Sequence, residues 1–119
     1  MHIYFSRCHF EDFETGTDIN YIKEISDYIE KTEELNYALI ELGHEIVYIK
    51  DWIPYKEIQK NIETCDCLLA FTDVFASTWK MSEITYAQHG AGAFECKDFH
   101  IPVFLYDVHK RIVSLSRDL

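Results

Sequence analysis

The fold is decided by the apolar run Cys67-Leu68-Leu69-Ala70-Phe71 and by the segment Ser77-Thr78-Trp79-Lys80-Met81-Ser82-Glu83-Ile84-Thr85-Tyr86-Ala87 that follows it. The short apolar run predicts a buried strand, and the second segment predicts a helix from about Thr78 to His89. A helix that follows a buried parallel strand is typical of α/β proteins, which bind ligands at the carboxyl ends of their strands. Glu83 is therefore the first candidate for a functional side chain.

The rest of the chain repeats this alternation of strands and helices. Hydrophobic periodicity predicts strands at 2–5, 44–49, 66–71 and 101–106, and helices at 19–42, 55–64 and 78–89. The first helix is expected to break near Lys31-Thr32 and to end at Gly43. The tail from Asp107 is compatible with a short helix or a short strand. Right-handed crossovers between such elements predict an α/β fold with a parallel sheet of four to five strands and helices on both faces.

Size and charge exclude several classes of protein. A chain of 119 residues is expected to form one domain, residues 1–119. A formal net charge of −10 makes nucleic acid and an acidic membrane surface poor partners. No stretch reaches the roughly 18 consecutive apolar residues of a bilayer span, and the N-terminus has no secretory signal pattern. The four cysteines are therefore expected to be reduced thiols in a cytoplasmic protein.

The second half of the deciding segment resembles a known family. The pattern Ser77-x-Trp79-x-x-x-Glu83 after an apolar strand is similar to the Toll/interleukin-1 receptor (TIR) domain. The resemblance extends to three further stretches of the chain, Ile3-Tyr4-Phe5-Ser6, Lys50-Asp51-Trp52-Ile53 and Ile101-Pro102-Val103-Phe104. It implies a flavodoxin-like three-layer sandwich. Against it, the chain is short and shows no clear fifth strand.

A second family competes with the first. Glu83-Ile84-Thr85-Tyr86-Ala87 also resembles the catalytic segment of nucleoside 2-deoxyribosyltransferases and their nucleotide N-hydrolase relatives, with one change. Those enzymes usually have a glycine soon after the first strand, whereas this chain has Ser6-Arg7-Cys8-His9. They also carry an aspartate before the third strand, where this chain has Ile58 next to Glu57. The departures favour the TIR resemblance.

Both resemblances imply cleavage of an N-glycosidic bond with Glu83 as the catalytic residue. Breaking this bond builds positive charge on the ribose, which a carboxylate can stabilise. The nicotinamide of NAD leaves as a neutral molecule and needs no general acid, whereas adenine or cytosine needs protonation. Because the chain offers one well-placed carboxylate, NAD is the favoured substrate, with no further cofactor. The alternative interpretation of Glu83 is a solvated carboxylate that stabilises the start of a helix.

Eight further residues are candidates for substrate binding. They lie after the first strand, in the loop after the second strand, or around the start of the third helix: Ser6, Arg7, His9, Phe10, Asp51, Trp52, Ser77 and Trp79. Arg7 could contact a pyrophosphate or pair with nearby acidic residues. Trp79 could stack on a base or lie in the core, and Ser77 could cap the helix or contact the ligand. The loop at Asp51 and Trp52 could close the site or contact a neighbouring subunit.

Other patterns point to structural roles. Cys65 and Cys67 are expected on opposite faces of a strand, so joint metal binding is not expected. His89, Cys96 and His100 lack the spacing and fourth ligand of a zinc site, and no metal is predicted. Three functions remain open at this point: a TIR-like NAD glycohydrolase or cyclase, a deoxyribosyltransferase-like N-hydrolase, and a non-enzymatic adaptor or nucleotide sensor. The TIR resemblance also implies self-association or a partner protein, and a role in antiphage defence.

Overall fold

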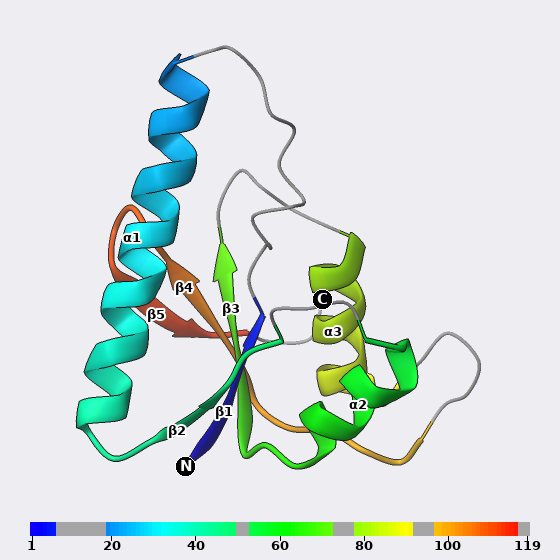
Figure 1. Ribbon diagram of the computed structural model, residues 1–119. Coiled ribbons are helices and arrows are strands. Elements are labelled where there is room, and N and C mark those ends of the chain that lie inside the picture. The colour runs from blue at the N-terminus through cyan, green and yellow to red at the C-terminus, as the bar shows by residue number, and fades with distance from the viewer. Residues whose placement is uncertain (7–18, 50–52, 73–77, 92–96, 117–119) are drawn as a thin grey trace.

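A computed structural model describes residues 1–6, 19–49, 53–72, 78–91 and 97–116 of the chain (Figure 1). The elements in chain order are β1 (His2–Ser6), α1 (Ile19–Glu41), β2 (Glu45–Val47), α2 (Tyr55–Glu63), β3 (Cys67–Thr72), α3 (Thr78–His89), β4 (Val103–Asp107) and β5 (Ile112–Leu115). All the predicted strands and helices are present, with ends that differ by at most two residues. The bounds predicted for α3 are confirmed.

The strands form one five-stranded sheet in the order β2-β1-β3-β4-β5. The neighbours β2, β1, β3 and β4 pair in parallel, as the sequence predicts. The fifth strand, one of the two possibilities left open for the tail from Asp107, runs antiparallel to β4, so the prediction of a parallel sheet is wrong at this edge. Asp107 pairs with Ile112, and the short turn between them cannot hold the crossover that a parallel connection needs. The mostly parallel sheet with its helices is compatible with a flavodoxin-like fold.

Two sets of buried side chains hold the helices to the sheet. Side chains of successive strand residues point to opposite faces, so Phe5 packs with α1 through Tyr28, while Tyr4 packs with α2 and α3 through Ile58 and Tyr86. Figure 1 shows α1 on one side of the sheet and α2 with α3 on the other. Tyr86 and Tyr106 are both buried.

The first helix is continuous through Lys31 and Thr32, so the predicted break is wrong. The Thr32 hydroxyl is fully buried and donates a 2.8 Å hydrogen bond to the carbonyl of Ile29, which satisfies it within the helix. No helix in the described part of the chain has the length and apolar composition of a bilayer-spanning segment.

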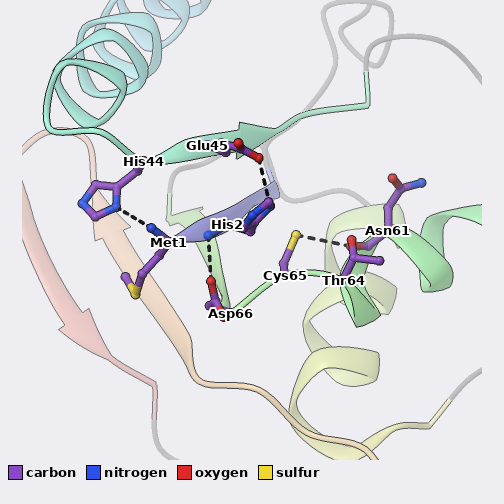
Figure 2. A network of polar contacts seen from close by, with 8 residues as sticks. All are labelled: Met1, His2, His44, Glu45, Asn61, Thr64, Cys65 and Asp66. Carbon is purple, nitrogen blue, oxygen red and sulfur yellow. Dashed lines mark hydrogen bonds and ion pairs between the residues drawn. The ribbon is translucent and has the colours of Figure 1, made fainter.

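The amino ends of the strands are joined by polar contacts (Figure 2). The Asp66 carboxylate accepts the backbone N–H of His2 at 2.8 Å, and the Asp66 N–H donates to the His2 carbonyl at 2.7 Å. The His2 ring lies 3.1 Å from the Glu45 carboxylate at the start of β2. These contacts fix the register of β1 against its two neighbours. They lie at the edge opposite to the one where α/β sheets bind ligands.

Candidate active site around Glu83

The carboxylate of Glu83 is buried between α3 and the sheet. Glu83 lies in the second turn of α3 and is only 6% exposed. Its carboxylate accepts a hydrogen bond from the hydroxyl of Tyr4 in the middle of β1. The alternative of a solvated carboxylate at the helix start is therefore wrong. A carboxylate in this position loses much of its hydration, and hydrogen bonds must offset that loss.

Tyr4 is a permanent hydrogen-bond donor in this pair. Burial raises its pKa far above the ordinary value, and the negative charge of Glu83 and the hydrogen bond between them raise it further. The phenol therefore keeps its proton at physiological pH and donates a hydrogen bond to the carboxylate. The pair joins β1, an interior strand of the sheet, to α3 through polar atoms within an otherwise apolar layer.

Helix α2 closes one side of this pair. The hydroxyl of Tyr55 donates a 3.3 Å hydrogen bond to the carbonyl of Ser82, next to Glu83. Burial raises the pKa of Tyr55; its side-chain hydrogen bond to the buried Gln59 opposes the shift, and the charge of Glu83 adds to it. We call the group Tyr4, Tyr55, Gln59, Ser82 and Glu83 the Glu83 cluster. Charge interactions within such a partly desolvated cluster are stronger than in water.

Ser6 lies at the carboxyl end of β1, paired in register with Ala70 of β3. It follows Tyr4 by two residues, so the two side chains share the face of the sheet that α2 and α3 cover. Its hydroxyl is fully buried and has no hydrogen-bond partner among the described residues. Ser6 and Glu83, two of the predicted site residues, are thus on the same face of the sheet.

Of the remaining predicted site residues, only Trp79 lies within the described part of the chain. Trp79 lies in the first turn of α3, four residues before Glu83, a spacing that places two residues on neighbouring positions of a helix surface. The candidates Arg7, His9, Phe10, Asp51, Trp52 and Ser77 lie outside the described residues. Their predicted roles in substrate binding stay predictions.

Four members of the cluster were not predicted from the sequence as site residues: Tyr4, Tyr55, Gln59 and Ser82. The alternation of β1 separates Tyr4 from Ile3 and Phe5 but does not reveal which face α3 covers. Gln59 follows the buried Ile58 and has no periodic signal of its own. A polar group expected in a core, such as a tyrosine on a central strand, is the signal that could have led to the cluster.

A second polar network lies nearer the amino ends of the strands. The Glu63 carboxylate at the end of α2 accepts hydrogen bonds from the Tyr86 hydroxyl and from Lys97 Nζ, the latter at 2.9 Å. The hydrogen bond from Tyr86, followed by that from Lys97, lowers the pKa of Glu63. Tyr86 holds α3 against α2 through this carboxylate, and Lys97 holds the segment before β4 against it. We assign this network a structural role.

The cysteines do not form a reactive pair. Cys65 packs with the residues that α2 and α3 cover, and Cys67 with those that α1 covers, which confirms the prediction of opposite faces. Burial raises the pKa of Cys65 to about 11, so the thiol stays protonated at neutral pH. Within the described ranges, no group of three or more histidine, cysteine, aspartate or glutamate side chains is placed to hold a metal ion.

The Glu83 cluster can stabilise a developing positive charge. A carboxylate held by neutral hydroxyl donors in a water-poor environment interacts with a cation more strongly than a hydrated one does.

Comparison of the chain with protein-family models, with curated proteins and with solved structures finds no match.

Proposed function

We propose that this chain is a flavodoxin-like three-layer sandwich of the TIR type that cleaves the nicotinamide–ribose bond of NAD. The observation that carries the proposal is the buried carboxylate of Glu83, held by the Tyr4 hydroxyl. The Ser6 hydroxyl, which has no hydrogen-bond partner among the described residues, lies on the same face of the sheet. Buried ionisable groups with specific polar partners are rare in purely structural cores and are frequent at active sites. The location next to the carboxyl end of β1 agrees with the ligand-binding edge of open α/β sheets.

In the proposed reaction the bond between C1′ of the ribose and the nicotinamide nitrogen breaks. Its electron pair passes to the positively charged pyridinium, which leaves as neutral nicotinamide. The ribose becomes electron-poor at C1′, and the negative charge of Glu83 stabilises it. A water oxygen then bonds to C1′ and loses a proton, which gives ADP-ribose; attack by an adenine nitrogen would give a cyclised product.

The proton on Tyr4 has a supporting role. Because its pKa is raised by burial and by Glu83, Tyr4 does not exchange its proton near neutral pH. It holds the Glu83 carboxylate by a hydrogen bond. Tyr4 therefore orients Glu83 and is not proposed as the acid that protonates a leaving group.

Cleavage of a deoxynucleotide by an N-hydrolase is the alternative, and the structure weighs against it at one point. That reaction needs a second acid for the departing base. Glu57, the carboxylate next to the position that matches the aspartate of those enzymes, is exposed on α2, while its neighbours Ile58 and Gln59 face inward. The Glu83 cluster as defined above thus contains a single carboxylate, which suits a leaving group that needs no protonation.

The test is incubation of the purified chain with NAD, and separately with each of the four 2′-deoxynucleoside 5′-monophosphates, with chromatographic detection of released base. The proposal predicts release of nicotinamide from NAD and little or no base from the deoxynucleotides. Base released mainly from a deoxynucleotide would favour the N-hydrolase. If neither substrate is consumed at high protein concentration, the chain is better explained as a non-enzymatic adaptor or sensor. Cytoplasmic location remains an expectation from the sequence pattern, and self-association and antiphage defence remain expectations from the resemblance.

A further inference from the structure

The Ser6 hydroxyl is a buried polar group with no partner among the described residues. A buried hydroxyl without a hydrogen bond is costly, and such groups are uncommon in folded proteins, so each one calls for a physical explanation. Thr32, another fully buried residue with a hydroxyl, shows the usual arrangement, because its oxygen donates to the Ile29 carbonyl at 2.8 Å. Ser6 departs from this rule at the ligand-binding edge of the sheet.

We propose that the Ser6 hydroxyl binds the 2′-hydroxyl of the substrate's nicotinamide ribose and thereby makes the site selective for ribonucleotides. This inference rests on the proposed function and assigns a substrate class to the same site. It explains why a hydroxyl is kept at a buried position where alanine would avoid the desolvation cost. A serine hydroxyl both donates and accepts, as does a sugar hydroxyl, so the two can pair in either direction.

The spacing along β1 suits this assignment. Residues two apart on a strand are separated by roughly 6.5–7 Å and point to the same side. Tyr4 fixes the carboxylate of Glu83 at one of these positions, and Ser6 occupies the next position toward the carboxyl end. A pentose whose C1′ lies against Glu83 would therefore have its hydroxyl-bearing edge next to Ser6. A deoxyribose in the same place would leave the Ser6 oxygen buried and unpaired, which a site can use for discrimination.

The test compares wild type with Ser6→Ala on NAD and on its analogue that lacks the 2′-hydroxyl of the nicotinamide ribose. Ser114→Ala, an exposed serine on β5, is the matched control. We expect Ser6→Ala to lower kcat/KM for NAD about tenfold, the loss typical of one hydrogen bond, and to lower it much less for the analogue. The ratio of the two kcat/KM values should fall about tenfold in Ser6→Ala and stay unchanged in Ser114→Ala. An unchanged ratio in Ser6→Ala, with NAD still cleaved, would overturn the role of Ser6 and leave the proposed function standing.

Thermal unfolding supplies a readout that does not depend on turnover. Without nucleotide, Ser6→Ala should unfold at the same temperature as wild type or slightly higher, because it removes an unsatisfied group; a clear decrease would show that Ser6 already has a structural partner and would overturn the inference. With millimolar NAD, the rise in unfolding temperature should be larger in wild type than in Ser6→Ala. If wild type releases no nicotinamide but shows this difference, the proposed function fails and the Ser6 contact stands as a binding contact. If NAD raises neither unfolding temperature, the Ser6 contact is refuted as well.

Discussion

At the scale of single residues, the pairing of Tyr4 with Glu83 is the feature that sets this chain apart from an ordinary α/β core. Each partner lies on a different element, and both are at least nine-tenths buried. The hydrogen bond offsets part of the desolvation that a buried carboxylate suffers. Removal of the Tyr4 hydroxyl deprives the carboxylate of this hydrogen bond, and the resulting loss of stability can be measured.

We expect Tyr4→Phe to lower the free energy of unfolding by about 1.5–3 kcal/mol, the range for a hydrogen bond to a charged group. Tyr37→Phe is the matched control, because Tyr37 is 64% exposed on α1 and should lose almost nothing. Urea unfolding monitored by circular dichroism measures both. In a Glu83→Gln background, the cost of Tyr4→Phe should be smaller, since the charge is absent. Equal costs in the two backgrounds would show that the hydroxyl of Tyr4 does not act through Glu83.

The sequence predicted Glu83 as a candidate but not its surroundings. Its position after an apolar strand follows from local pattern, and Ser6 follows from its place at the end of β1. The burial of Glu83 depends on Tyr4, which is distant in sequence and comes into contact only when α3 packs on β1. Pairwise contacts of this kind carry no local signal, so the pairing of Tyr4 with Glu83 could be identified only from the structure.

At the scale of elements, two glycines at positive φ end helices in different surroundings. Gly43 follows α1 with φ +91°, and Gly90 follows α3 with φ +66°. A Cβ added at Gly43 would meet nothing within 4 Å, whereas one at Gly90 would lie 2.1 Å from the Lys97 carbonyl oxygen. The Lys97 N–H also donates to the Gly90 carbonyl at 2.9 Å, so the two backbones are held together. Gly90 therefore allows the segment before β4 to pack against the end of α3.

We expect Gly43→Ala to cost about 1–2 kcal/mol of unfolding free energy, the strain of a left-handed non-glycine residue. Gly90→Ala should cost several kcal/mol more or prevent folding, because a backbone carbonyl cannot move away cheaply. Chemical denaturation of the two variants side by side makes the comparison. Similar losses in both would mean that the approach of Lys97 to Gly90 is not part of the folded state.

Element boundaries were predictable where periodicity and end signals agree. For α3, both the predicted and observed bounds are Thr78 and His89, and Tyr55 begins α2 directly after Pro54, as expected for a proline at a helix start. β5 could not be predicted, because Ile112–Leu115 are all exposed and so show no alternation of buried and exposed positions. Its identity comes from the hairpin that pairs it with β4.

At the scale of the whole molecule, buried groups that ionise at high pH make stability depend on alkaline pH. Burial raises the pKa of Tyr4 and Tyr55 above their ordinary value of 10.0, and raises that of Cys65 from 9.0 to about 11. The unfolded chain therefore loses these protons at lower pH than the folded chain does. Stability from this source is complete below about pH 9 and declines as pH rises through the folded-state values.

We expect the free energy of unfolding to be insensitive to these groups from pH 7 to 8.5 and to fall above pH 9. Each group that ionises only in the unfolded chain contributes about 1.4 kcal/mol per pH unit. Urea titrations at half-unit intervals from pH 7 to 10.5 measure the slope. Cys65→Ala should reduce the slope between pH 9 and 10.5, since it removes one of the titrating groups. A flat profile above pH 9 would contradict the burial of these side chains.

The arrangement of the whole sheet was predictable only in outline. Strand–helix alternation indicated parallel pairing and helices on both sides, and the order β2-β1-β3-β4 agrees with that prediction. The antiparallel edge depends on the short turn after Asp107, where sequence pattern left a helix and a strand equally compatible. The position of Glu83 against β1 results from the packing of α3 on the face of the sheet that includes Tyr4, which only the assembled fold determines.

The central claim is that the Glu83 carboxylate promotes cleavage of an N-glycosidic bond, and nicotinamide release from NAD tests it most directly. Glu83→Gln keeps the shape of the side chain and removes its charge, and Glu24→Gln, an exposed residue of α1, is the matched control. The account predicts that wild type and Glu24→Gln release nicotinamide at similar rates, and that Glu83→Gln, folded by circular dichroism, is at least about a hundredfold slower. Full turnover by folded Glu83→Gln would contradict the account.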